Sequence, residues 1–282
     1  MHLFCQHSYG RATLIKIVNQ AKYTARTPVI ITLSVWKALF LREAVSRLSA
    51  GRAAWFWLLL EPLMHIVFLA VLFTVIRMRT VGGIDTALWI MVGMLAFFMF
   101  RQTGTQSMNA VNANQALFAY RQVKPVDAVL VRAGMEGFLL IMIATTLFFG
   151  AGLFGMDVIP ADPLAVLRAF FGLWLIGLGF GLVTSVIREM TPELGKFIGL
   201  AMMPLYFFSG VIIPISSIPE PYRSWLLFNP VAHGLEAARL GFAPHYHAVA
   251  DLSVSCLYGF ALVAIFIGLA LHIRFSMRMI AL

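Results

Sequence analysis

The chain has 282 residues, of which 61% are hydrophobic and only 12% are charged, and its mean hydropathy is +0.88. Soluble domains carry about 25% charged residues, so this composition indicates a protein that folds in a lipid bilayer. The formal net charge is +9, but the basic residues flank apolar runs and form no patch with interleaved aromatics, which argues against nucleic-acid binding. Cys5 and Cys256 lie far apart in sequence and predict neither a disulfide framework nor a zinc site.

Residues 1–53 form a basic arm with a single acid, Glu43. The arm has no apolar stretch leading to a small-residue cleavage site, so we do not expect a signal peptide. Within it, apolar residues recur at helical spacing from Ala38 to Leu48, and residues 32–52 are therefore predicted to form an amphipathic helix in the cytoplasmic interface. A solvated basic arm is the alternative, because the charges spread around most of the helix.

Six apolar stretches predict an all-α membrane protein, with a six-span bundle in residues 54–274 and a tail in residues 275–282. A spanning helix needs about 20 apolar residues. The second stretch becomes polar from Arg101 onward, so its lower half must face protein or water; the fifth is short and contains Pro204 and Gly210, so full lipid exposure is not expected. The six predicted spans are Trp55–Ile76, Ala87–Met108, Ala128–Phe154, Leu164–Ile187, Phe197–Ile213 and Leu252–Ile273.

The distribution of cations predicts the orientation. With the N-terminus in the cytoplasm, the inner segments hold 16 of the 21 Lys and Arg residues, and the outer segments hold the remaining five. The positive-inside rule therefore places both termini in the cytoplasm.

The segment from Pro204 to Pro244 holds six of the twelve prolines and is still rich in apolar residues. It is too broken for a span and too apolar for a free loop, so we expect short helices that dip back into the outer face of the membrane. Asn229 and Pro230 are typical of a helix start, which predicts a helix over Val231–Leu240 that ends at Gly241.

A half-polar cytoplasmic segment, Asn109–Pro125, connects the second and third predicted spans. It exposes more apolar surface than a linker requires, which suggests a docking surface for another subunit. A plain connecting turn is the alternative. The candidate docking residues are Leu117, Phe118, Tyr120, Arg121 and Lys124.

The search for catalytic chemistry finds no acid, base and nucleophile set. His233 and Glu236 lie three residues apart on one predicted helix, but a metal site needs more ligands, so no metal is expected. The chain contains no Gly-x-x-x-x-Gly-Lys-Ser/Thr loop. We therefore expect it not to be an enzyme, and expect ATP and Mg to be bound by a separate ATPase subunit.

Two groups of residues are candidates for a functional role inside the helix bundle. Glu61 and His65 lie four residues apart on one helix face, and the cost of a charge in lipid predicts that they are buried among the helices. A structural hydrogen bond and a proton relay are both open readings. Aromatic rings stack on sugars, so a second group is a candidate lining for a substrate path: Trp89, Phe97, Phe98, Phe100, Arg101 and Gln102.

The order of these features resembles the ABC-2 type transporter permeases. Within them the chain resembles the capsular polysaccharide export family. The similarity rests on Arg42-Glu43 before the Gly51-Arg52 turn, on Trp57–Pro62, on Phe207–Pro214 and on Asn229-Pro230 with Glu236 and Arg239 downstream. It extends over nearly the whole chain, as a single transmembrane domain.

The resemblance implies a bacterial inner-membrane homodimer that binds two ATPase subunits and exports a lipid-linked, acidic polysaccharide to periplasmic co-polymerase and outer-membrane export proteins. By position it implies that Asn109–Lys124 couples to the ATPase and that Asn229, His233, Glu236 and Arg239 belong to an outer gate. An ABC-2 permease for O-antigen, teichoic acid or a drug is the alternative. A membrane-embedded glycosyltransferase and a non-transporting scaffold are more distant alternatives.

Overall fold

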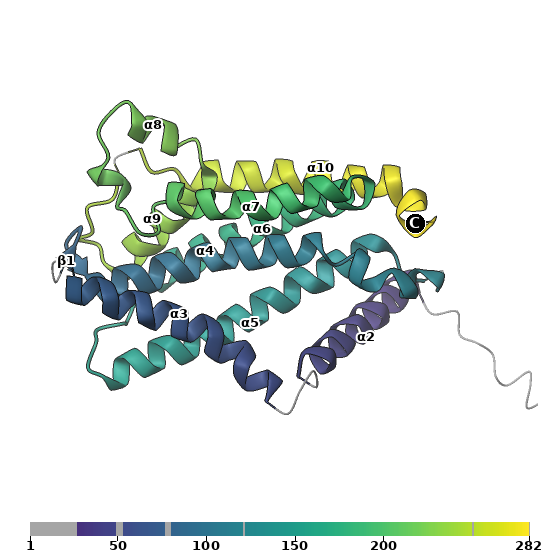
Figure 1. Ribbon diagram of the computed structural model, residues 1–282, viewed down its shortest axis with the longest axis horizontal. Coiled ribbons are helices and arrows are strands. Elements are labelled where there is room, and N and C mark those ends of the chain that lie inside the picture. Colours follow the sequence, from purple (N-terminus) through teal and green to yellow (C-terminus); the bar gives the residue numbers. More distant parts are fainter. Residues whose placement is uncertain (1–26, 49–52, 77–79, 121, 250, 282) are drawn as a thin grey trace, which may run out of the picture.

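The computed structural model describes residues 27–48, 53–76, 80–120, 122–249 and 251–281. Within these ranges the protein is a helical bundle (Figure 1). Five helices are long and apolar enough to cross a membrane. They are α3 (Ala54–Ile76), α4 (Thr86–Met108), α5 (Pro125–Leu153), α6 (Pro163–Met190) and α10 (Val254–Ala281).

Helix α7 (Pro192–Phe208) occupies the place of the fifth predicted span. It begins five residues earlier than predicted and ends before Ser209, and its 17 residues extend about 26 Å. Spanning helices have about 17–25 residues, so α7 is at the lower limit of that range and is not one of the five helices named above. It packs against α6 and α4.

The long helices run between two ends of the bundle. One end, called here the α2 end, holds α2 (Pro28–Leu48), the 3-10 helix η1 (Asn112–Ala119), the turn between α6 and α7, and the C-terminus. The other, called the hairpin end, holds the strands β1 (Thr80–Val81) and β2 (Ile84–Asp85), together with η2 (Ile215–Ser217), α8 (Tyr222–Leu226) and α9 (Pro230–Phe242).

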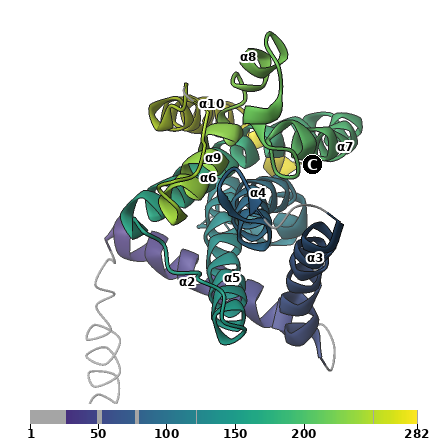
Figure 2. The same cartoon turned by 90° about the vertical axis from the view of Figure 1, so that its left-hand side faces the viewer.

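The outer segment is broken into short helices, as its prolines predicted. Asn229 caps α9 by accepting a hydrogen bond from the backbone N–H of Val231, which confirms the predicted start of this helix. The predicted end at Gly241 was wrong, because the helix continues to Phe242. Figure 2 shows α8 projecting away from the other helices, and its Trp225 is largely exposed.

The centre of the bundle is α4, and glycines of α6 let the backbones of α4 and α6 lie in direct contact. A Cβ atom on Gly177 of α6 would lie 2.8 Å from the carbonyl oxygen of Phe100, and one on Gly181 would lie 2.3 Å from Cβ of Ser107. On the opposite face of α6, a Cβ atom on Gly179 would lie 2.8 Å from Cβ of Ala264 in α10. Gly177 and Gly181 have the small-xxx-small spacing that lets two helices approach closely, and α4, α6 and α10 form one tightly packed block.

Candidate functional site

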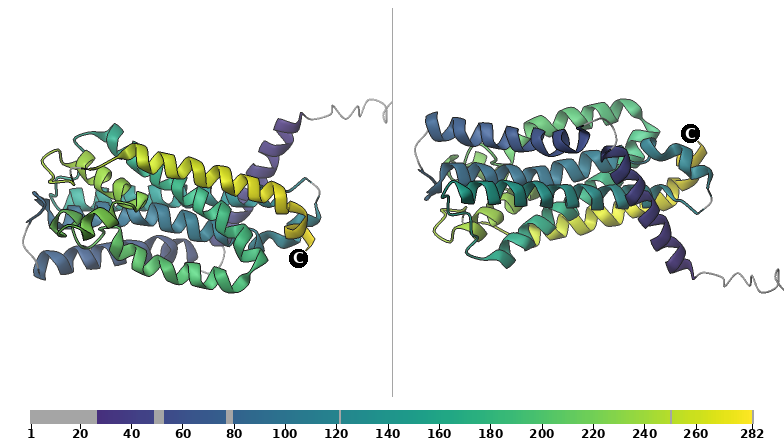
Figure 3. Two further views of the ribbon diagram at one scale, coloured as in Figure 1. Left: turned by 90° about the horizontal axis from the view of Figure 1, so that it is seen from above. Right: turned by 90° about the horizontal axis from the view of Figure 1, so that it is seen from below.

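Helix α2 crosses the bundle obliquely at the α2 end (Figure 3) and is held there by a network of ion pairs with α5. Arg47 pairs with Glu136 of α5, and Arg132 of α5 pairs with Glu43. Within each helix, Arg47 Nε lies 2.9 Å from Glu43 Oε1, and Arg132 Nε lies 3.5 Å from Glu136 Oε1. These four side chains are only 7–16% exposed, so the pairs are largely shielded from water.

Arg132 and Glu136 lie four residues apart on α5, so their pair is local in sequence, whereas their two partners on α2 are distant in the chain. Burial disfavours the charge on Arg47, but its hydrogen bonds and charge contacts with Glu136 and Glu43 outweigh this and raise its pKa above the ordinary value. Arg47 therefore stays charged, and α2 stays electrostatically attached to α5.

The same face of α2 also reaches η1 and the start of α5. Arg42 donates to the side-chain oxygen of Asn114 in η1. The indole of Trp36 donates to Asp127 Oδ1 at 2.8 Å, and Asp127 Oδ2 accepts the backbone N–H of Lys124 at 3.0 Å. Helix α2 thus touches both the cytoplasmic segment predicted from sequence and the helix that follows it.

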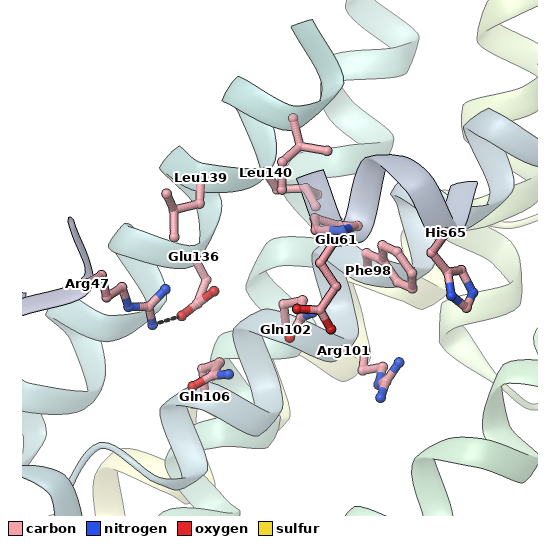
Figure 4. Close-up of a pocket in the computed structure, with 12 residues that line it drawn as sticks. Arg47, Glu61, His65, Phe98, Arg101, Gln102, Gln106, Glu136, Leu139 and Leu140 are labelled. Carbon is pink, nitrogen blue, oxygen red and sulfur yellow. Dashed lines mark hydrogen bonds and ion pairs between the residues drawn. The ribbon is translucent and has the colours of Figure 1, made fainter. Parts of the chain in front are cut away.

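A groove of about 370 Å³ lies beside this network, between α2, α3, α4 and α5 (Figure 4). Arg47 and Glu136 form its end wall, and Leu139 and Leu140 of α5 form an apolar side. The remaining lining residues are Glu61, Pro62, His65, Phe98, Arg101, Gln102, Gln106 and Ile143. The volume falls in the range of about 300–1,000 Å³ typical of small-molecule sites.

Several polar side chains of this groove have no hydrogen-bond or ion-pair partner among the described residues. They include the side chains of Glu61, Arg101 and Gln102. Glu61 lies seven residues after the start of α3 and Arg101 seven residues before the end of α4, so both are about 10 Å from the helix ends. A charged side chain at the centre of a spanning helix costs about 2.5–3.5 kcal/mol to insert, so side chains at this depth are favoured to meet water or a ligand in the groove.

The expectation that Glu61 and His65 are buried among the helices was wrong for the single chain. Both side chains are exposed on the groove wall, because α3 contributes little buried surface to the bundle apart from Ile66 and Ala70. His65 lies against the ring of Phe98, with ring centroids 6.0 Å apart.

The predicted aromatic lining divides into two groups. Trp89, Phe97 and Phe100 are at most 3% exposed and form part of the core, so in this conformation they have no surface for a substrate. Phe98, Arg101 and Gln102 line the groove and so border a space that is open to a substrate. Sequence spacing alone does not separate the two groups, because they share one helix.

Three of the four predicted outer-gate residues, His233, Glu236 and Arg239, are buried at the hairpin end, and the fourth, Asn229, is the half-buried cap of α9. The guanidinium of Arg239 is fully buried and donates to the carbonyl oxygens of Gly210 at 2.8 Å, Val211 at 3.1 Å and Trp89 at 3.4 Å. It also pairs with Glu236 Oε1 at 3.0 Å and lies 3.7 Å from the centre of the Trp89 ring.

Neighbouring side chains complete this outer cluster. The hydroxyl of Tyr246 donates to Glu236 Oε1 at 3.1 Å, and burial raises the pKa of Tyr246 to about 12. His233 contacts the carbonyl oxygen of Leu227 at 2.9 Å through Nε2 and accepts the N–H of Ser253 through Nδ1. Every one of these contacts joins chain segments to one another, so the cluster is a structural junction.

The predicted coupling residues point in different directions. Phe118 is only 5% exposed and packs into a core cluster with Val129 and Leu182, so it cannot contact a partner in this conformation. Tyr120 is 67% exposed and Lys124 is exposed, while Leu117 is half-buried. Arg121 lies outside the described residues. The docking expectation therefore rests on Tyr120 and Lys124, and the assignment of Phe118 as an anchor was wrong.

Comparisons with known proteins place this architecture in a family. The family model for "ABC-2 type transporter" matches residues 34–243, from within α2 to the residue after α9. The chain belongs to the ABC-2 type transporter family.

Curated relatives within this ABC-2 group are similar along most of their length. The polysialic acid transport protein KpsM of Escherichia coli is 34% identical over 84% of this chain and 91% of its own. The capsule polysaccharide export inner-membrane protein BexB of Haemophilus influenzae is 28% identical over 78% of this chain and 83% of its own. CtrC of Neisseria meningitidis, which carries the same description, is 26% identical over 76% and 81%.

Proposed function

We propose that this chain is the permease subunit of an ABC exporter that moves lipid-linked capsular polysaccharide from the cytoplasm to the periplasm. The observation that carries the proposal is the similarity, over most of both chains, to proteins named for polysialic acid transport and capsule polysaccharide export. The groove with unpaired polar groups at membrane depth supports it, because a polar polymer needs such groups to cross an apolar layer.

A complementation experiment tests this function. Deletion of the gene should abolish surface polysaccharide while polymer accumulates inside the cell, and the wild-type chain should restore export. The readout is surface and intracellular polysaccharide measured in the same cultures. Normal surface polysaccharide in a verified deletion strain would refute the proposal.

The proposed topology has six spans in the bacterial inner membrane, with α7 as the fifth span and both termini in the cytoplasm. Its support is the charge distribution: Arg42, Lys124, Arg188, Lys196 and Arg278 all belong to elements at the α2 end. Reporter fusions near residue 115 and at residue 282 should report cytoplasm, and fusions near residues 160 and 225 should report periplasm. A periplasmic signal at residue 115 would contradict the orientation.

The proposed assembly is a homodimer with two separate ATPase subunits, which bind ATP and Mg. Exposed Tyr120 and Lys124 beside η1 are the proposed contact, since aromatic anchors dominate many interfaces. Tyr120→Ala should reduce copurification of the ATPase and export together. Phe154→Ala, which alters another exposed ring at the hairpin end, is the matched control and should change neither. Unchanged copurification in Tyr120→Ala would exclude Tyr120 as an anchor.

Export also requires a route beyond the inner membrane. We propose that a periplasmic co-polymerase and an outer-membrane export protein receive the polymer at the hairpin end. Loss of either partner should leave polymer in the periplasm, which fractionation distinguishes from the cytoplasmic accumulation expected when the permease itself is missing.

A further inference from the structure

We propose that the groove between α2, α3, α4 and α5 is a glycan-binding site, in which Glu61, Arg101 and Gln102 bind the hydroxyl groups of one or a few sugar units. The inference rests on the proposed function and assigns the contact to particular side chains. It separates this groove from the outer cluster, in which Arg239 is bonded to Glu236 and to backbone carbonyls of the same chain.

The first argument is the set of free hydrogen-bonding groups. Glu61 offers acceptors, Arg101 offers donors and Gln102 offers both, and none of the three has a hydrogen-bond or ion-pair partner among the described residues. Figure 4 shows Glu61 directed from α3 into the space in front of Gln102 and Arg101 of α4. Unpaired polar groups at membrane depth are a mark of a functional site.

The second argument is the balance of charge, which favours a polyhydroxyl ligand over an ion. Arg47 and Glu136 neutralise each other at the end wall, and the free groups comprise one guanidinium and one carboxylate. An anionic headgroup would meet the carboxylate of Glu61, and a cation would meet Arg101. A sugar hydroxyl both donates and accepts hydrogen bonds, so adjacent hydroxyls can satisfy both side chains at once.

The third argument is the shape of the lining. Pro62, Leu139, Leu140 and Ile143 provide apolar surface on the walls, and the ring of Phe98 lies between the polar groups and His65. Sugar rings combine apolar C–H faces with polar edges, and ligand sites generally combine an apolar lining with a few placed polar groups. The two kinds of surface in this groove match the two kinds of surface on a sugar.

Two neighbouring positions on α5 provide a matched experiment. Leu139 lines the groove, whereas Phe138 lines a separate apolar pocket with Phe171 and Trp174. A photoreactive benzoylphenylalanine is placed at one position or the other in the full-length chain, in cells with the complete exporter and polymer synthesis. After irradiation, the permease is purified and probed with an antibody against the cell's own polymer.

The expected result is a polymer adduct at position 139 that is at least about tenfold stronger than at position 138. Gln102→Leu and Glu61→Leu should each weaken that adduct about tenfold, while Glu61→Gln, which keeps hydrogen-bonding capacity, should retain most of it. Variant levels in the membrane are measured in parallel. If Gln102→Leu fails to accumulate, Arg101→Gln provides the same comparison.

Equal adducts at both positions, an adduct only with phospholipid, or an adduct with a second copy of this chain would each overturn the glycan site. So would wild-type adduct strength in the Leu variants. These failures differ from failure of the proposed function, because the wild-type chain would still restore export to the deletion strain. If the wild-type chain does not restore export, the proposed function itself is wrong.

Discussion

Arg239 and Arg101 are both arginines of an apolar bundle, and their surroundings are opposite. Arg239 at the hairpin end is fully buried, donates to three backbone carbonyls, pairs with Glu236 and stacks on Trp89. Arg101 in the groove is exposed and has no hydrogen-bond or ion-pair partner among the described residues. An arginine whose donors are bonded to its own chain stabilises the fold, whereas an arginine with free donors can bind a ligand.

The comparison gives a practical criterion for charged residues in membrane helices. On sequence alone, both arginines are candidate functional residues, because charged residues within a bundle are costly and usually functional. The criterion is how many donors the fold itself occupies, and it assigns Arg239 to stability and Arg101 to ligand contact.

The largest expected effect is that of Arg239→Met. The substitution removes the donor to three carbonyls and the cation that pairs with Glu236, which keeps only Tyr246 as a donor, and breaking a buried pair costs about 3–5 kcal/mol. We expect the variant to be nearly absent from membranes, as measured by immunoblotting, and to unfold at much lower temperature in detergent. A stable, abundant Arg239→Met protein would remove the structural half of the comparison.

Gly93→Ala tests the same cluster from α4. A Cβ atom at this position would lie 2.2 Å from Nη2 and 3.0 Å from Cζ of Arg239. Overpacking of this kind costs about 1–3 kcal/mol, so the unfolding midpoint should fall. Gly134→Ala in α5 is the matched control, because no heavy atom lies within 4 Å of the added Cβ. Equal midpoints for the two variants would show that Arg239 can shift without cost.

A smaller effect is expected at the α2–α5 network, which is intermediate between the two arginines in exposure. An exposed ion pair contributes about 0–1 kcal/mol to the free energy of unfolding. Removing one partner of a fully buried pair costs more than that. For side chains that are 7–16% exposed, we expect a coupling energy of about 1–2 kcal/mol between Arg47 and Glu136. A double-mutant cycle with Arg47→Gln and Glu136→Gln measures it, and a value near zero would mean that this ion pair does not contribute to holding α2 against α5.

The smallest effect on stability is expected for Arg101→Met. No side-chain hydrogen bond or ion pair with the described residues is lost and a charge is removed from a membrane helix, so the free energy of unfolding should not fall by more than about 0.5 kcal/mol. Thermal unfolding in detergent, run beside Arg239→Met, gives the direct comparison. A loss as large as that of Arg239→Met would show that Arg101 has a structural partner after all.

Sequence reasoning located most helices because the signals are local. Apolar run lengths placed five spanning helices, and Asn229 marked the start of α9 through its own side chain. The position of α7 was missed by five residues, because apolar residues continue past Phe208 while the chain turns at Gly210 with φ +76°.

Side-chain environments were harder to predict because they depend on distant residues. Arg47 finds Glu136 across 89 positions, and Arg239 finds Trp89 across 150. Phe118 and Tyr120 are two residues apart in a polar connector, and only the packing of η1 decides that one is buried and the other exposed. Local patterns contain no information on either choice.

The close packing of α4 against α6 has a mechanical consequence. Helix α4 carries Trp89 of the outer cluster near its start and leads into η1 at its end, and its 23 residues extend about 34 Å. Because Gly177 and Gly181 bring the two backbones together, there is little free space in which α4 could bend or slide independently of α6. A force applied at η1 would therefore displace α4 as a rigid body, and the displacement would reach the hairpin end with little loss through bending.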